Sequence, residues 1–315
     1  MTAHRIDVHA HFPVDLRHGP DPRRAPWARW DTDHALRQLD RLRIRRQYLS
    51  LPALPVHRAP DDQPSPGTVA RAVNDKFAEI ITDAPERFGA FATVPGDDID
   101  AAVAEARRAL DDLGLHGIAL GSNAAGRYLG DPWYEPLFAE AAARDVPVFV
   151  HPAQNPLAGP LALDRPPFLV EFPLDTFRSV VDAVYAGVFS RHPELRVVVA
   201  HCGGALPALA WRVSSLAGLV APRDEHPGAT PAEVAASLSG LYLDTALSGS
   251  PGVLSAAIDL VGADHILYGT DSGAAPHDVI VTNTDGLAQA GLTRAELAGI
   301  EHDNAAALFS HAPGA

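Results

Sequence analysis

Short apolar runs alternate along this chain with longer stretches in which apolar residues recur every three to four positions. The short runs are rich in β-branched and aromatic residues, which is typical of strands. The spacing in the longer stretches is that of a helix with one buried face. The pattern predicts eight strands separated by helices, with the strands at 6–11, 47–51, 89–94, 117–120, 148–151, 197–199, 241–244 and 265–268.

The predicted strands indicate a parallel sheet. Residues 197–199 are three consecutive valines, and parallel strands covered by helices on both faces need such continuous apolar runs. Eight strand–helix units in 315 residues predict an α/β protein of the (β/α)8 TIM-barrel type, with a doubly wound open sheet as the competitor. No repeat or linker divides the sequence, so we expect residues 1–315 to form a single barrel domain with a helical tail from about Thr293.

Four of these strands end in, or lead directly to, a histidine or an aspartate. His9 and His11 end the first strand, while His151, His201 and Asp271 follow the fifth, sixth and eighth. Residues two apart on a strand point to the same side, so His9 and His11 present their imidazoles together. The C-terminal strand ends of a (β/α)8 barrel meet at its catalytic face, and this placement therefore favours the barrel over the open sheet.

These residue types form a candidate metal site. Three imidazoles and a carboxylate suit Zn²⁺ and are acceptable to Mn²⁺ or Fe²⁺, and the proposed ligands are His9, His11, His151 and Asp271. His201 is left over; it is either a fifth ligand or a general base or acid beside the metal. Asp244, at the end of the seventh strand, is either a partner of a ligand or a helix cap.

Lys76 and Cys202 limit the chemistry further. A second metal usually needs a bridging carboxylate, often a carboxylated lysine on a central strand, and Lys76, the only lysine, falls on a predicted helix. We therefore expect one metal ion. Cys202 is adjacent to His201, but neighbouring strand residues point to opposite faces, so we expect a buried thiol rather than a nucleophile.

Composition and charge exclude several classes of partner. The net charge of -14 provides no basic surface for nucleic acid or for an anionic membrane. No apolar run approaches the roughly 18 residues of a membrane span, and the N-terminus lacks the apolar segment of a signal peptide. The single cysteine excludes an internal disulfide, and we expect a cytoplasmic protein.

The strand-end motifs resemble those of the metal-dependent amidohydrolase superfamily. Within it, the chain resembles the branch of aminocarboxymuconate-semialdehyde decarboxylase, and two stretches are most similar to the subgroup with 6-methylsalicylate decarboxylases. The resemblance extends over nearly the whole chain. It rests on His9-Ala10-His11, His151-Pro152, His201-Cys202-Gly203-Gly204 and Gly269-Thr270-Asp271, on residues 74–75, 85–89 and 116–118, and, for the subgroup, on 127–132 and 242–249.

The resemblance implies an activity. In this branch the residues matching His9, His11, His151 and Asp271 hold one divalent metal, the residue matching His201 is catalytic, and most members release CO2 without an organic cofactor. We therefore expect a metal-dependent carboxy-lyase acting on a small carboxylic acid, with a salicylate-type hydroxybenzoate as the first candidate. Either Asp271 or a water linked to His201 would protonate the ring carbon that loses CO2. The alternatives are a metal-dependent hydrolase of a lactone or amide and a catalytically silent metal-binding barrel.

The resemblance also indicates substrate contacts. Relatives bind the substrate carboxylate with an arginine from the loop after the first strand, and Arg23 has the matching spacing to Trp30-Asp31. A solvated basic loop is the competing interpretation of Arg23. Phe168 is a candidate to stack on an aromatic ring, although packing is the commoner role. Relatives are commonly dimers, so we expect a homodimer, with the helical tail as a possible contact.

Overall fold

Parallel strands form the centre of the computed structural model, which describes residues 4–12, 30–51, 65–161, 163–221 and 228–310. Two sheets, β1-β2-β3 and β4-β5-β8-β9-β10-β11, follow one another in chain order. Only Phe91 separates β3 from β4, so the two act as one interrupted strand, and eight strands result. Their bounds are Arg5–His11 (β1), Ile44–Ser50 (β2), Phe88–Ala90 (β3), Ala92–Thr93 (β4), Ile118–Gly121 (β5), Val148–His151 (β8), Val197–Val199 (β9), Tyr242–Asp244 (β10) and Ile266–Leu267 (β11).

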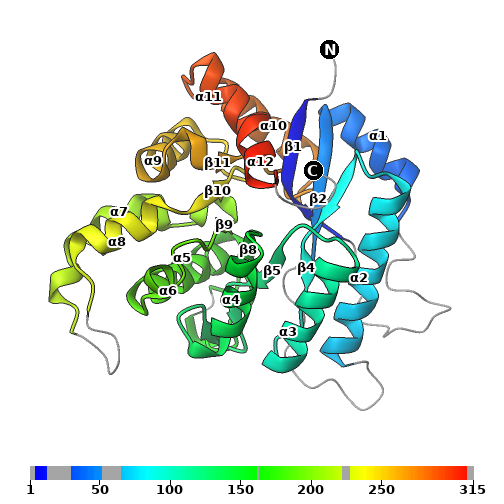
Figure 1. The fold of residues 1–315 in the computed structure, drawn as a ribbon. Coiled ribbons are helices and arrows are strands. Elements are labelled where there is room, and N and C mark those ends of the chain that lie inside the picture. The colour runs from blue at the N-terminus through cyan, green and yellow to red at the C-terminus, as the bar shows by residue number, and fades with distance from the viewer. Residues whose placement is uncertain (1–3, 13–29, 52–64, 162, 222–227, 311–315) are drawn as a thin grey trace.

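Hydrogen bonds between the first strand and the end of the last one close the ring. The Val8 amide donates to the Tyr268 carbonyl at 3.0 Å, and the Asp271 amide donates to the His9 carbonyl at 2.9 Å. A closed parallel sheet with outer helices is the predicted (β/α)8 barrel. Figure 1 shows the helices placed round the strands in chain order.

The helices begin where sequence signals for capping occur. The Ser65 side chain accepts from the Thr68 amide, with Pro66 in the first turn of α2, and Thr230 and Glu233 form a capping box at α8. The helices are Thr32–Leu42 (α1), Pro66–Asp83 (α2), Ile99–Arg107 (α3), Glu135–Ala143 (α4), Glu171–Tyr185 (α5), Val188–Arg191 (α6), Leu206–Ser215 (α7), Pro231–Ser239 (α8), Pro251–Val261 (α9), His277–Ala288 (α10), Arg294–Ala298 (α11) and Asn304–Leu308 (α12). None of the helices in the described ranges is long and apolar enough to span a bilayer.

One local expectation was wrong. The third strand is not continuous over 89–94 but breaks at Phe91. The segment between β5 and α4 contains a small antiparallel hairpin of β6 (Asn123–Ala124) and β7 (Arg127–Tyr128). Helix α5 begins at Glu171 and is preceded by two short 3-10 turns, Gly159–Leu161 and Pro167–Leu169.

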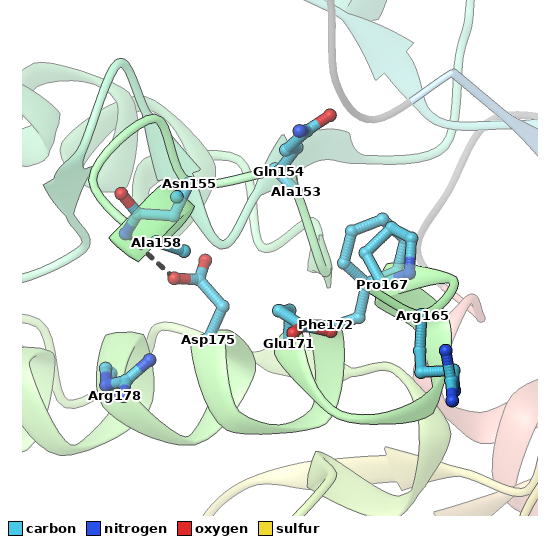
Figure 2. A pocket seen from close by; sticks show the side chains of 11 residues that line it. Ala153, Gln154, Asn155, Ala158, Arg165, Pro167, Glu171, Phe172, Asp175 and Arg178 are labelled. Atoms are coloured by element: carbon cyan, nitrogen blue, oxygen red, sulfur yellow. Dashed lines mark hydrogen bonds between the residues drawn. The ribbon is translucent and has the colours of Figure 1, made fainter. Parts of the chain in front are cut away.

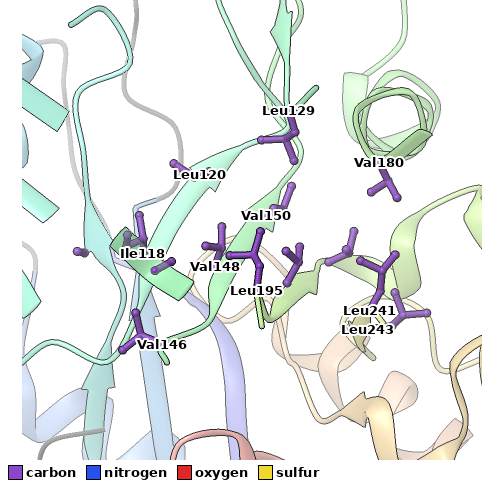
Figure 3. Close-up of a cluster of buried hydrophobic side chains, with 14 of the residues drawn as sticks. Ile118, Leu120, Leu129, Val146, Val148, Val150, Val180, Leu195, Leu241 and Leu243 are labelled. Atoms are coloured by element: carbon purple, nitrogen blue, oxygen red, sulfur yellow. The ribbon is translucent and has the colours of Figure 1, made fainter. Parts of the chain in front are cut away.

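Two apolar layers hold the barrel together. The outer layer lies between strands and helices, and Figure 3 shows Ile118, Val148 and Leu243 in it. The inner layer fills the barrel with alternate strand residues such as Phe91 and Phe149. Side chains that leave water in this way contribute roughly 1.5–3 kcal/mol each.

The C-terminal tail completes the inner layer. Leu308 and Phe309 belong to it, and the Phe309 ring stacks on that of Tyr48 at a centroid distance of 4.0 Å. In Figure 1, α12 lies beside β1 and β11. The described part of the tail therefore packs on its own barrel.

Candidate metal centre

A bulge in β1 positions the first two histidines. Asp7 pairs with Gln47 and Ala10 with Leu49, so β1 has one residue more than β2 between these pairs. Bulges re-aim side chains and often lie beside active sites. Here both Val8 and His9 point into the barrel. Val8 packs in the inner apolar layer, and Nε2 of His9 lies 3.4 Å from His11 Nε2.

The predicted strand-end residues converge at the C-terminal face of the barrel. Among the described residues, the ligand atoms of His9, His151, His201 and Asp271 all lie within 4.8 Å of one another. His11 is also close, because its Nε2 lies 2.9 Å from Asp271 Oδ1. The structure thus brings together all five residues and places His201 within the group of potential ligands, which the sequence had left open.

Fixed hydrogen bonds orient three of the imidazoles. The Nδ1 atoms of His151 and His201 lie 2.8 and 3.1 Å from the carbonyl oxygens of Pro152 and Ala246, and Nδ1 of His9 lies 2.9 Å from Asp244 Oδ2. Carbonyls and carboxylates only accept hydrogen bonds, so each Nδ1 carries the proton. In its neutral form each ring therefore offers the lone pair of Nε2 to the centre, as metal ligands do.

The charges in the cluster are strongly coupled. Burial disfavours a charged His9, but Asp244 and then Asp271 raise the pKa of His9 to about 10. Burial and the neighbouring imidazoles keep the pKa of His151 well below its ordinary value, and burial lowers the pKa of His201. Burial opposes ionisation of Asp271, yet His11 and His9 hold its pKa far below the usual range. Without a metal ion, these shifts favour an ionised Asp271, neutral His151 and His201, and a protonated His9.

An unsatisfied oxygen shows that the residues fit a cation. Asp271 Oδ1 is buried and has no partner with hydrogen-bond geometry among the described groups, although His11 Nε2 and His9 Nε2 lie 2.9 and 3.4 Å away. A buried carboxylate oxygen without a donor is costly. A divalent ion among three nitrogen donors and this oxygen would satisfy it, and that donor set suits zinc.

The backbone at His201 is strained. The φ angles of His201 and Cys202 are 57° and 51°, and those of Gly203 and Gly204 are 72° and 62°. Left-handed non-glycine residues cost on the order of 1–3 kcal/mol each and cluster at functional sites. Gly204 must be glycine, since a Cβ there would lie 2.4 Å from the Pro173 carbonyl oxygen. Cys202 is buried, as expected, and burial raises the pKa of its thiol to about 12, which disfavours the reactive thiolate.

A carboxylate overlooked in the sequence joins the first and last strands. Asp7 is fully buried and accepts hydrogen bonds from the amides of His9 and Thr270, from Thr270 Oγ1 and from Gln47 Nε2. Desolvation raises the pKa of Asp7 to about 6. Its position two residues before His9, on the same predicted strand face, was the available signal. Asp7 fixes the strand ends that present His9 and Asp271.

A pocket of about 150 Å³ lies between the loop that follows β8 and the start of α5 (Figure 2). It is lined by loop residues that begin two positions after His151 and by the start of α5, and Arg165 and Arg178 contribute guanidinium groups. Phe168 lies on the neighbouring 3-10 turn and is 61% exposed, and it does not line this pocket. Arg23 lies outside the described residues.

A (β/α)8 barrel with imidazoles and a carboxylate gathered at its C-terminal strand ends defines a metal-dependent enzyme of the TIM-barrel class. The family model described as "Amidohydrolase" matches residues 6–310. The chain belongs to the amidohydrolase family.

Relatives and solved structures agree with this assignment. 6-Methylsalicylic acid decarboxylase of Penicillium expansum is 30% identical over 299 residues, covering 90% of this chain and 89% of the relative. 2-Amino-3-carboxymuconate-6-semialdehyde decarboxylase of Dictyostelium discoideum is 29% identical over 243 residues, covering 77% and 66%. The crystal structure of 2,6-dihydroxybenzoate decarboxylase complexed with 2,6-dihydroxybenzoate superposes with a TM-score of 0.81 at 26% identity, covering 98% and 99%.

The comparisons confirm three predictions. The chain is a member of the amidohydrolase superfamily, in the branch of aminocarboxymuconate-semialdehyde decarboxylase. It is similar along most of its length to decarboxylases of hydroxybenzoates, and its class of enzyme is the expected carboxy-lyase.

Proposed function

We propose that this protein is a metal-dependent, non-oxidative decarboxylase of a salicylate-type hydroxybenzoate. The observation that carries the proposal is the convergence of three oriented Nε2 atoms and an unsatisfied carboxylate oxygen at the C-terminal face of the barrel. The similarity to a 6-methylsalicylic acid decarboxylase supports the substrate class. The whole chain, residues 1–315, would act as one domain.

The residues proposed to hold one divalent ion are His9, His11, His151 and Asp271, with zinc as the first candidate and manganese as the alternative. The ion would supply positive charge to orient the carboxylate and the adjacent phenolate of the substrate. His201 is then the catalytic residue, and no organic cofactor takes part. His201 lies close to the other ligand atoms, so it could also be a fifth ligand. A substitution of His201 must test this alternative.

Loss of CO2 directly from the ring would leave an aryl anion without an electron sink, so the carbon that bears the carboxylate must be protonated first. His201 has a lowered pKa and its Nδ1 donates to the Ala246 carbonyl, so Nε2 is free to take a proton from a water and pass it to that carbon. Asp271 is the alternative donor, but its low pKa makes it a poor holder of a proton. The hydrogen bond at Nδ1 supports His201 as the donor, and Asp271 stays the alternative.

The remaining contacts are also proposed. Arg23 binds the substrate carboxylate, and Phe168 packs against the aromatic ring. The protein is a cytoplasmic homodimer that binds neither nucleic acid nor a membrane.

The test combines metal analysis with product analysis. The purified protein is assayed with 6-methylsalicylate, 2,6-dihydroxybenzoate and salicylate, and with a panel of lactones and amides. We expect about one metal per chain, CO2 and the corresponding phenol. Bound metal with hydrolysis of a lactone or amide and no CO2 would show that the protein is a hydrolase instead. Protein that contains no metal although it was prepared with excess metal would contradict both functions.

A further inference from the structure

Asp244 contacts two parts of the centre at once. Its carboxylate lies at the end of β10, is fully buried, and places Oδ2 2.9 Å from Nδ1 of His9. The other oxygen, Oδ1, accepts from the amide of Ala246 at 2.8 Å and from the amide of His201 at 3.3 Å. One side chain thus joins β1, β10 and the strained turn after β9.

The Ala246 peptide extends this connection to the His201 ring. Its amide is held by Asp244, and its carbonyl oxygen lies 3.1 Å from Nδ1 of His201. The orientation of the His201 imidazole therefore depends on the loop that Asp244 fixes. The left-handed φ of 57° at His201 also requires an anchor, and its amide hydrogen bond to Asp244 provides one.

The last strand makes room for this carboxylate. A Cβ at position 269 would lie 2.8 Å from Asp244 Oδ1 and 3.0 Å from His9 Cβ. Gly269 therefore permits the close approach of Asp244 to His9, which explains the glycine two residues before Asp271 in physical terms.

We infer that Asp244 is a positioning residue that sets the tautomer of His9 and the orientation of His201 together, and so couples metal affinity to proton transfer. The inference rests on the proposed function, because it assigns His9 and His201 to metal binding and proton transfer. Asp244 touches neither the substrate nor the reacting carbon. It acts through the two histidines.

Asp244→Asn tests this with almost no change in volume. The amide has one acceptor oxygen and one donor nitrogen. If the nitrogen faces His9, Nδ1 of His9 must become the acceptor and Nε2 gains the proton, which removes its lone pair from the metal. If the nitrogen faces the amides of Ala246 and His201, donors oppose donors and the turn loses its anchor.

Cobalt(II) is the probe, because its visible spectrum reports the ligand field. In Asp244→Asn we expect about 10- to 100-fold weaker Co²⁺ binding, a changed spectrum of the cobalt-saturated protein, and a lower kcat for CO2 release at saturating metal. Glu105→Gln is the matched control, since Glu105 is a buried, hydrogen-bonded carboxylate on α3. It should lose thermal stability only, with unchanged Co²⁺ affinity and spectrum.

Three results would overturn the inference. Asp244→Asn with wild-type affinity, spectrum and kcat would show that Asp244 positions nothing. Equal changes in Glu105→Gln would show a general loss of stability instead. Wild-type protein that takes up no cobalt would remove the metal centre itself, a failure of the proposed function that is distinct from the other two.

A second variant covers the case in which Asp244→Asn does not fold. Gly269→Ala keeps the carboxylate but presses a methyl group against Asp244 Oδ1. We expect weaker Co²⁺ binding and an altered cobalt spectrum in this variant too, and an unchanged affinity and spectrum would count against the inference.

Discussion

Phe149 and His151 lie two residues apart on β8 and belong to different ends of the barrel interior. The Phe149 ring stacks on Phe91 at 5.1 Å, in the layer that Phe309 completes. The His151 ring lies 4.6 Å from that of His11, in the candidate metal centre. Of two inward positions on one strand, one therefore packs in the apolar layer and the next is a candidate metal ligand.

The two ends obey different rules. The inner apolar layer consists of complementary rings and aliphatic side chains. The opposite end contains left-handed residues at His201 and Asp271, an unsatisfied oxygen, and histidines with shifted pKa values. Strain and unpaired groups persist only where the surrounding structure supports them and where function requires them. The comparison shows that packing at the apolar end stabilises the fold, whereas strain and unpaired groups at the metal end destabilise it.

The largest expected effect is at His151. His151→Ala should remove most of the bound metal and lower kcat for CO2 release by at least about a thousandfold, because several kcal/mol of barrier lowering correspond to that factor. Elemental analysis and a CO2 assay on one preparation measure both. His277→Ala, an exposed histidine at the start of α10, should keep its metal. Full metal occupancy in His151→Ala would remove it from the ligand set.

The next effect separates catalysis from metal binding. His201→Ala should retain about one metal per chain and lower kcat by about 10²- to 10⁴-fold, the usual contribution of a general acid or base. Metal analysis and steady-state kinetics of the variant measure the two effects. A metal-free His201→Ala protein would make His201 a ligand, contrary to the role proposed for it.

At the apolar end the effect is on stability. Phe309→Ala should lower the free energy of unfolding by about 3–5 kcal/mol, measured by urea unfolding, with metal content and kcat unchanged while the protein is folded. Val281→Ala, on a side chain that is 39% exposed, should cost far less. Loss of metal from folded Phe309→Ala protein would show that the apolar end and the metal centre are not independent.

The smallest effect is a proton count. His9 is protonated in the metal-free protein because its pKa is raised to about 10, whereas His151 and His201 are neutral. Metal binding at pH 8 should therefore release about one proton per chain, and affinity should rise about tenfold per pH unit up to about 10. Calorimetry of Mn²⁺ binding in buffers of different ionisation enthalpy measures this release. No proton release would show that His9 is not a ligand.

The same shift affects the stability of the metal-free protein. The pKa of His9 is near 6.5 in the unfolded chain and about 10 in the folded protein. The protonated ring therefore contributes its full stabilisation below about pH 6.5, and this contribution is lost as the pH rises through about 10. Urea unfolding of metal-free protein at pH 6, 8 and 10 should show this decline. Stability that rises over this interval would contradict the pKa of His9.

The sequence predicted the barrel and the convergence of His9, His11, His151, His201 and Asp271, because strand ends can be read from apolar runs and all C-terminal ends meet at one face. It could not predict the bulge in β1, which depends on pairing with β2 rather than on local pattern. Strict alternation places Val8 and His9 on opposite faces, yet both enter the interior.

Other features required three-dimensional contacts. The double role of Asp244 depends on amides of residues 201 and 246, which no spacing rule connects. The left-handed turn at His201 was not predicted, since histidine and cysteine rarely adopt it. The tail was predicted as helix, but its docking under the barrel depends on rings such as Tyr48 and Phe91, far away in sequence.

Anomalous X-ray diffraction at the zinc edge, from crystals of the metal-loaded protein, tests the central claim most directly. The account predicts one peak per chain, within bonding distance of Nε2 of His9 and His151 and of a carboxylate oxygen of Asp271. A peak elsewhere on the barrel, or two peaks at this face, would contradict it.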